Sequence, residues 1–293
     1  GVEGLREGDD VVLTHNGRSI ALLEIEEVYG YDKMELASKV FQTTDTAHPG
    51  VEKTLAMKDK LLGGKITLIG HVDNPYEKYT LNPLETRVLF KELGWRTIVA
   101  FQTRNAPHLG HEFLQKITLA MADGVFINPV IGRKKKGDFR DDVILAAYDT
   151  LIRNYYPKSS VVLSILRYEM RYAGPREAIH HAIMRKNFGC THIIIGRDHA
   201  GVGKYYDPYA AQRIFEDFPD LGITPLFFRE FFYCRKCANV VNERICPHGQ
   251  SMRVTFSGTK LREMILRGER PPVEFMRPEV VDVIMSYSNP FVE

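Results

Sequence analysis

Polar side chains gather at residues 102–111, where an apolar run gives way to a helical pattern. The run at residues 98–101 is typical of a buried strand, and apolar residues recur at helical spacing from Leu109 onward. Between them lie two amides, a hydroxyl, a guanidinium and two imidazoles: Gln102, Asn105, Thr103, Arg104, His108 and His111. Ligands of open α/β sheets bind at the carboxyl ends of strands, and helix N-termini offer unpaired N–H groups to anions. We therefore expect this segment to bind an anionic ligand.

A second polar loop follows the β-branched run at residues 193–195. It comprises Gly196, Arg197, Asp198, His199, Ala200, Gly201, Val202 and Gly203. Its three glycines allow backbone N–H groups to approach a ligand closely and to form an anion-binding concavity. A glycine-rich loop can also be a simple turn, but the charged triplet between strand and glycines favours a binding role.

A third segment, residues 171–178, forms a tight turn that opens a helix, with Pro175 suited to the first helical turn. Its Arg, Tyr, Glu and glycine residues could belong to the same site. They could also do no more than cap a helix at the surface, and the spacing alone leaves both interpretations open.

The elements that must position these loops alternate between strand and helix patterns. Expected strands cover residues 98–101, 125–131, 161–166, 192–195 and 225–228, and expected helices cover 83–93, 110–122, 139–155, 175–188 and 208–218. Alternation at this spacing predicts a doubly wound parallel sheet with right-handed crossovers. We assign residues 76–228 to this Rossmann-like α/β domain.

Residues 1–75 are β-rich, with strand patterns at 10–14, 19–28 and 65–72 and one expected helix at 33–41. Asn16-Gly17 between the first two strands is a strong hairpin signal. The chain opens on Gly1 without a methionine, in what looks like the middle of a domain. We therefore expect a segment upstream of this partial β domain.

Three cysteines and a histidine cluster at Cys234, Cys237, Cys246 and His248. Three thiolates and an imidazole at this spacing form the ligand set of a closed tetrahedral zinc site. Four protein ligands leave no position for water, so we expect a structural role within residues 229–293, a region of the zinc knot and helices. The alternative is unligated thiols. Cys190 lies in an apolar stretch and is expected in the core.

Composition narrows the class of protein. With 293 residues, 44% hydrophobic and 26% charged, the chain is typical of a soluble globular protein of two or three domains. No apolar run approaches the roughly 18 residues of a membrane span. The formal charge is only +2, so anion binding must come from locally placed basic residues. Clustered cysteines with metal-ligand spacing predict a reducing, cytoplasmic compartment.

Four motifs together resemble the ATP sulfurylase (sulfate adenylyltransferase) family of nucleotidylyltransferases. They are Gln102-Thr-Arg-Asn105 with His108-Leu-Gly-His111, Arg171-Tyr-Ala-Gly-Pro-Arg-Glu177, Gly196-Arg-Asp-His-Ala-Gly201 and Phe256-Ser-Gly-Thr259-Lys-Leu-Arg262. Residues 28–51 are similar to the later half of the family's PUA-like N-terminal domain. Some bacterial and archaeal members carry a similar zinc knot, and the resemblance covers residues 28 to 290.

The resemblance implies that sulfate attacks the α-phosphorus of MgATP in line, giving adenylyl sulfate and pyrophosphate. Gln102, Arg104 and the Ala200 backbone would hold sulfate, and Arg197 would neutralise charge on sulfate and phosphate. His108 and His111, assisted by Asn105, would bracket the β- and γ-phosphates. The implied catalytic set is Thr103, Arg104 and Asn105, and the implied substrate-binding set also contains Asp198, His199 and Gly201. Mg²⁺ would arrive with ATP, zinc would be structural, and a homo-oligomer is expected.

One departure from the family pattern is Leu109-Gly110 between His108 and His111, where the common motif His-Arg-Ala-His has Arg-Ala. One basic side chain beside the phosphates is therefore absent. Another nucleotidylyltransferase, acting on a phosphopantetheine or nicotinamide nucleotide, would share His108 and His111. It would not be expected to share the motifs at 102–105 and 196–199.

An RNA-binding protein is the alternative from a different class, because a PUA-like domain with a zinc knot can mark one. Against it stand the near-neutral charge and the lack of a basic stripe interleaved with aromatic residues. Residues 133–136 form the one basic run, which we expect to be a solvated loop. We expect neither nucleic acid nor a membrane as a partner.

Overall fold

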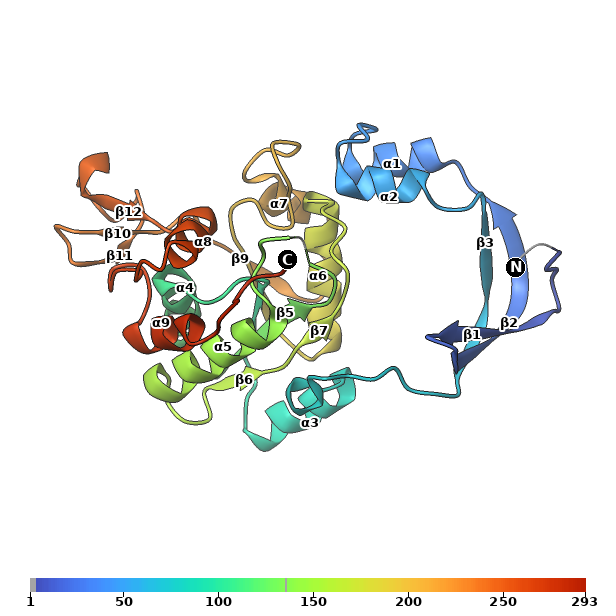
Figure 1. The fold of residues 1–293 in the computed structure, drawn as a ribbon, viewed down its shortest axis with the longest axis horizontal. Helices are drawn as coiled ribbons and strands as arrows, with labels where there is room; N and C mark the ends of the chain where they lie inside the picture. The colour runs from blue at the N-terminus through green and yellow to red at the C-terminus, as the bar shows by residue number, and fades with distance from the viewer. Residues whose placement is uncertain (1–3, 135) are drawn as a thin grey trace.

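The computed structural model describes residues 4–134 and 136–293, and Figure 1 shows them as three parts. An N-terminal module of one sheet and two helices precedes a central α/β domain, and a small β unit with two further helices follows it. Lys135, within the expected basic loop, lies outside the described residues. Lys134 corrects that expectation, because its side chain is only 8% exposed and pairs with Asp141 at 2.7 Å.

The central sheet has the strand order β6-β5-β4-β8-β9, with the short strand β7 also pairing with β5. Every pairing in it is parallel. The strands are β4 (Ile98–Thr103), β5 (Gly124–Ile131), β6 (Val161–Leu163), β7 (Leu166–Arg167), β8 (His192–Ile195) and β9 (Thr224–Phe227). The order reverses at β4, which confirms the predicted doubly wound sheet and puts the switch point between β4 and β8.

Helices cover both faces of this sheet because its central strands are apolar on both sides. Val99 and Phe101 of β4 pack with α5 (Asp141–Tyr155) and α9 (Pro278–Met285). Ile98 and Ala100 face the other layer, which contains α3 (Pro83–Glu92) and α6 (Pro175–Asn187). The predicted helix at 208–218 is instead a short α7 (Ala210–Arg213) continued as a 3₁₀ turn, Ile214–Asp217.

The N-terminal module contains an antiparallel sheet of β1 (Asp10–His15), β2 (Arg18–Gly30) and β3 (Lys60–Leu68). The predicted hairpin is confirmed, because Asn16 and Gly17 have φ of 50° and 76°, as a tight primed turn requires. Strand β3 starts five residues earlier than expected. Gly64 sits opposite an irregularity in β2, where a Cβ would lie 1.9 Å from the Glu24 carbonyl oxygen.

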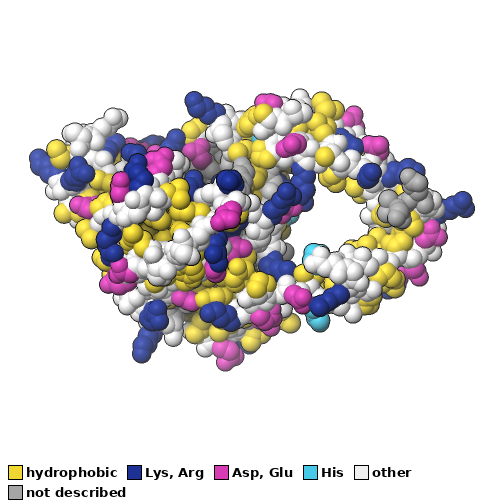
Figure 2. All heavy atoms as spheres, viewed as in Figure 1, with side chains coloured by type: hydrophobic (Ala, Val, Ile, Leu, Met, Phe, Trp, Pro, Cys, Tyr) yellow, Lys and Arg dark blue, Asp and Glu magenta, His cyan; other side chains and the backbone are white. Residues whose placement is uncertain are grey.

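Two helices follow β2, where the sequence predicted one. The expected helix is α1 (Lys33–Phe41), and the missed one is α2 (Pro49–Leu55). His48 caps α2, accepting hydrogen bonds from the N–H groups of Gly50 and Val51. Figure 2 shows an opening between the N-terminal sheet and the central domain, which the helices span on one side. On that face basic and acidic side chains are interspersed rather than gathered in one stripe.

The C-terminal region forms a second antiparallel sheet, with β10 (Phe232–Cys234) between β11 (Asn239–Val241) and β12 (Arg253–Thr255). Helix α8 (Gly258–Leu266) follows, and α9 returns to pack on α5. No helix in the described ranges has both the length and the apolar character that crossing a bilayer would require.

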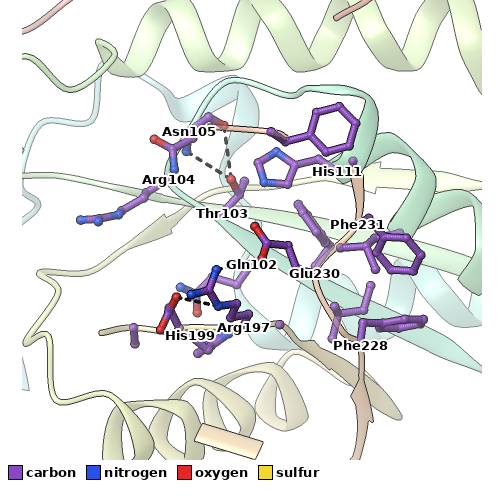
Figure 3. Close-up of a pocket in the computed structure, with 18 of the residues that line it drawn as sticks. Gln102, Thr103, Arg104, Asn105, His111, Arg197, His199, Phe228, Glu230 and Phe231 are labelled. Carbon is purple, nitrogen blue, oxygen red and sulfur yellow. Dashed lines mark hydrogen bonds and ion pairs between the residues drawn. The ribbon is translucent and has the colours of Figure 1, made fainter. Parts of the chain in front are cut away.

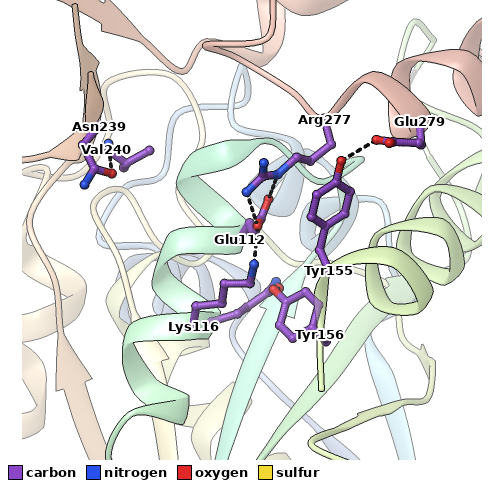
Figure 4. A network of polar contacts seen from close by, with 9 residues as sticks. Glu112, Lys116, Tyr155, Tyr156, Asn239, Val240, Arg277 and Glu279 are labelled. Carbon is purple, nitrogen blue, oxygen red and sulfur yellow. Dashed lines mark hydrogen bonds and ion pairs between the residues drawn. The ribbon is translucent and has the colours of Figure 1, made fainter. Parts of the chain in front are cut away.

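An ion-pair network around the buried carboxylate of Glu112 joins the start of α9 to α4 (Leu109–Leu119), the helix that follows the first polar segment. Arg277 donates two hydrogen bonds of 2.8 Å to the carboxylate of Glu112, which also accepts one of 2.6 Å from Lys116 (Figure 4). Burial alone would raise the pKa of Glu112, but the two cationic donors outweigh it and lower that pKa. This bidentate contact fixes the start of α4 against the C-terminal region.

Candidate active site

A cavity of about 480 Å³ opens at the carboxyl ends of β4 and β8, the adjacent strands at the switch point of the sheet (Figure 3). All the residues proposed from sequence for sulfate and nucleotide line it: Gln102, Thr103, Arg104, Asn105, His108, His111, Arg197, Asp198, His199, Ala200 and Gly201. Two loops nearly a hundred residues apart therefore face one space. That proximity follows from the parallel pairing of β4 with β8.

The first loop is shaped by Thr103 at the end of β4. Its hydroxyl accepts a hydrogen bond from the Asn105 N–H and lies 3.2 Å from the Asn105 carbonyl oxygen, forming a compact turn. Arg104 points from this turn toward Tyr172, donating to its hydroxyl at 3.1 Å with the guanidinium 5.2 Å from the ring centroid. The guanidinium is thereby held at the mouth of the cavity, with donors remaining for an anion.

His108 and His111 stack on one another, with ring centroids 3.7 Å apart. His108 caps α4, and its Nδ1 accepts a hydrogen bond from the His111 N–H at 3.2 Å. Burial lowers the pKa of His108 well below its usual value, with a further contribution from His111, and burial lowers the pKa of His111 to about 4. Both rings are therefore neutral at pH 7. They offer hydrogen bonds rather than positive charge to a ligand.

The second loop holds Arg197 between two carboxylates. Arg197 donates through Nη1 to Glu230 at 2.9 Å, and its Nε lies 3.4 Å from Asp198. Asp198 and Ala200 both have positive φ, 53° and 57°, which turns the backbone sharply around the cavity. Alternation of such conformations is the geometry in which backbone N–H groups form anion-binding nests.

Behind this loop runs a buried polar network. The Nε2 of His199 lies 3.0 Å from the Nδ1 of His181, and the His181 Nε2 lies 3.6 Å from Glu177. Burial lowers the pKa of His199 to about 3, with His181 contributing. The Glu177 carboxylate also accepts hydrogen bonds from the N–H groups of Arg171 and Ala173. The 171–178 turn is thus interior rather than a surface cap, and it connects to both polar loops.

Three side chains that the sequence did not indicate contact the predicted site: Tyr172 binds Arg104, and Glu230 and Phe256 line the cavity. Tyr172 lies in a motif that was noted, yet nothing in its spacing indicated that its ring would reach Arg104. Phe256 belongs to the Phe-Ser-Gly-Thr motif and stacks on His108. Glu230 follows β9 and carries no local signal, because its role depends on the approach of Arg197.

Comparisons with known proteins show which family the chain resembles. The ATP-sulfurylase family model matches residues 77–287. The chain belongs to the ATP sulfurylase family. A model of the PUA-like domain matches residues 1–71.

Two relatives, both named sulfate adenylyltransferase, extend over the whole chain. The protein from Hyperthermus butylicus is 63% identical over 292 residues, covering 100% of this chain and 75% of that protein. The one from Pyrococcus abyssi is 62% identical over 287 residues, covering 98% and 76%. A solved structure described as a hexameric APS kinase from Thiobacillus denitrificans shares the fold, with a TM-score of 0.71 and 22% identity over 99% of this chain and 51% of that one.

The ligand atoms of Cys234, Cys237, Cys246 and His248 all lie within 4.8 Å of one another in this ATP sulfurylase family member. The Cys237 and Cys246 sulfurs are 3.8 Å apart, and the three sulfurs lie 3.3–3.6 Å from the His248 Nδ1. Tetrahedral zinc, with bonds of about 2.3 Å to sulfur and about 2.0 Å to nitrogen, would place these atoms about 3.8 and 3.5 Å apart. The cluster therefore fits a four-coordinate metal ion. Cys190 is buried away from it, as expected.

Proposed function

We propose that this pocket transfers the adenylyl group of MgATP to sulfate, releasing pyrophosphate and forming adenylyl sulfate. The observation that carries the proposal is the convergence of the 102–111 and 196–201 loops on one cavity of about 480 Å³ at the switch point of the sheet. The sulfate adenylyltransferase names of relatives above 60% identity support the same reaction.

The two arginines form the sulfate end of the pocket in this proposal. Arg104, with Gln102 and the Ala200 backbone, holds the sulfate, because a guanidinium matches a tetrahedral oxyanion with paired donors. Arg197, on the second loop, neutralises the charge that accumulates on sulfate and on the α-phosphate. Its carboxylate partners Asp198 and Glu230 fix the guanidinium while leaving Nη2 for the ligand.

The stacked imidazoles form the phosphate end. His108 uses Nδ1 as an acceptor for the His111 N–H, so its Nε2 carries the proton and can donate to a phosphate oxygen. His111 provides the second ring, and Asn105 assists from the turn. Neutral donors suit a nucleotide that arrives with Mg²⁺, because the metal already balances part of the phosphate charge.

Sulfate is fully ionised at neutral pH and needs no general base to attack phosphorus. Catalysis therefore rests on aligning sulfate opposite the pyrophosphate leaving group and on stabilising charge in the transition state. Tyr172, Asp198 and Glu230 already hold the two arginines in place. The pocket therefore needs little reorganisation as negative charge develops in the transition state. The expected catalytic set, Thr103, Arg104 and Asn105, lies on the turn that fixes this alignment.

The metal of the Cys3His cluster is zinc in this proposal, with a structural role. The cluster links the end of β10, which follows Glu230, to the segment between β11 and β12, the strand that precedes Phe256. It thereby supports two pocket walls without entering the cavity. We further propose three units at residues 1–75, 76–228 and 229–293, a homo-oligomeric assembly and a cytoplasmic location.

The test is whether pyrophosphate release from MgATP depends on added sulfate. We expect release only when both substrates are present, and expect ATP formation when adenylyl sulfate and pyrophosphate are supplied. Turnover of ATP that ignores sulfate but responds to an organic phosphate would contradict the assignment.

A further inference from the structure

The N-terminal module contacts the α/β domain beside the pocket, where α2 begins (Figure 1). A Cβ on Gly50 would lie 2.5 Å from the Arg171 carbonyl oxygen, so only glycine permits this close approach of the two backbones. Ala37, Phe41 and Val51 of the module also enclose Ala173 in a shared apolar cluster. The start of α2 is therefore packed directly against residues 171–173.

His48 makes the polar contact at this junction and is fully buried. Its Nδ1 accepts from the N–H groups of Gly50 and Val51, so this nitrogen carries no proton. The proton must then lie on Nε2, which is 3.1 Å from the Tyr172 carbonyl oxygen and 3.2 Å from the Tyr206 hydroxyl oxygen, and it can donate to the carbonyl. One imidazole thus caps α2 and contacts the backbone of Tyr172, the residue whose hydroxyl binds Arg104.

Tyr172 is held in an uncommon conformation, with φ of 60°. Bulky residues rarely adopt this region, and they keep it only where the surroundings determine it. Here the Glu177 carboxylate binds the N–H groups on both sides, at Arg171 and Ala173, while His48 binds the carbonyl. This backbone aims the Tyr172 hydroxyl at Arg104, 3.1 Å away.

We propose that His48 and Tyr172 are positioning residues for Arg104, through which the N-terminal module sets the geometry of the sulfate end of the pocket. The inference rests on the proposed role of Arg104. His48 touches no reacting group, and it acts by fixing the Tyr172 backbone, whose ring and hydroxyl then orient the guanidinium. Loss of either residue should impair sulfate use while leaving the nucleotide end intact.

Two substitutions of His48 separate its two contacts. In His48→Asn the short amide can still cap α2, because Asn is among the best N-cap residues, but it does not reach the Tyr172 carbonyl. In His48→Gln the longer amide can donate to that carbonyl but caps poorly. We expect His48→Asn and Tyr172→Phe each to raise the KM for sulfate about tenfold, the loss typical of one hydrogen bond that orients a charged group. His48→Gln should recover part of that loss despite its poorer cap.

The control is Tyr205→Phe, which removes the 2.8 Å hydrogen bond to Asp45 across the same junction but keeps the ring that packs edge-on against His48. It should change the KM for sulfate by no more than about twofold, as expected for an exposed contact. The Kd of a non-hydrolysable ATP analogue should be unchanged in all four variants. The double variant His48→Asn with Tyr172→Phe should be little worse than the poorer single one, because both act along one path.

Equal effects of Tyr205→Phe and His48→Asn, or a KM for sulfate that His48→Asn leaves unchanged, would overturn the proposal. If His48→Asn fails to fold, the single variants Tyr172→Phe and His48→Gln provide the same comparison.

A second readout does not depend on turnover. Labelling of Arg104 by phenylglyoxal, followed by mass spectrometry, should be faster in His48→Asn and in Tyr172→Phe than in Tyr205→Phe. Absence of sulfate-dependent turnover in the unmodified protein would refute the proposed function, whereas unchanged labelling would refute the positioning path.

Discussion

The ring of Phe256 lies nearly parallel to the imidazole of His108, with ring centroids 4.9 Å apart and an angle of 6° between the planes. Gly110 permits this contact. A Cβ at Gly110 would lie 2.6 Å from the Phe256 ring and 3.1 Å from the His108 Cε1. The lack of a side chain at Gly110 therefore makes room for the Phe256 ring beside His108.

Gly110→Ala should displace Phe256 and disturb His108, costing about 1–3 kcal/mol of stability, as is typical of overpacking. We expect a weaker affinity for a non-hydrolysable ATP analogue, measured by calorimetry, together with a lower melting temperature. Gly30→Ala is the control, because its Cβ would meet only the Asp59 carbonyl oxygen at an ordinary 3.8 Å. Unchanged nucleotide binding in Gly110→Ala would show that the stacked ring has no part in the phosphate end.

Arg104→Ala and His111→Ala should separate the two ends of the pocket. Removing a preorganised charged donor typically lowers turnover about a hundredfold or more, so we expect that loss in Arg104→Ala with ATP binding nearly unchanged. His111→Ala should instead weaken nucleotide binding and the use of pyrophosphate in the reverse direction. Calorimetric titration of both variants with the ATP analogue checks this. Abolished nucleotide binding in Arg104→Ala, with full activity in His111→Ala, would mean that the ends are assigned wrongly.

The main outlines of the fold and the pocket could be predicted because they depend on local patterns. Strand β4 reads as an apolar run and is followed by Gln102 to Asn105, so the position of that loop follows from the rule for strand ends. Helix α2 was missed because His48 is not among the usual N-cap residues and only seven residues follow. The predicted strand began too late because Gly63 and Gly64 resemble the end of a turn. In the structure they belong to β3, where they lie opposite an irregularity in β2.

Contacts between distant segments could not be predicted in this way. Tyr172, in the turn before α6, meets Arg104, in the turn after β4, although they lie 68 positions apart in the chain. Glu230 meets Arg197 only because β9 pairs with β8. The burial of Lys134 was likewise hidden, since its partner Asp141 lies at the start of α5, beyond the loop. No periodicity within one segment records these approaches.

The neutral state of His111 leads to a prediction about pH. Its pKa of about 4, compared with about 6.5 for a free imidazole, means that the ring gains its proton only well below pH 6. The nucleotide Kd of His111→Ala divided by that of the unmodified protein should therefore stay constant between about pH 6 and 8. Taking a ratio removes the titration of the nucleotide itself. A ratio that is large at pH 6 and falls as pH rises would show that His111 binds phosphate as an imidazolium.

The Cys3His cluster leads to the last prediction, because its metal should matter more for stability than for binding. The purified protein should contain about one zinc per chain, the stoichiometry of a closed four-ligand site. Cys237→Ser should lose the metal and lower the melting temperature on the order of 5–10 °C, since β10 to β12 have only a small core of their own. Below that temperature the ATP analogue should bind nearly as before, because the cluster lies outside the cavity lining.

The control is Cys190→Ser, which alters a buried cysteine far from the cluster in sequence and should keep the metal. Metal analysis, thermal melting and calorimetry on the same preparations distinguish the outcomes, and a zinc-free Cys237→Ser protein with an unchanged melting temperature would show that the cluster does not stabilise the fold.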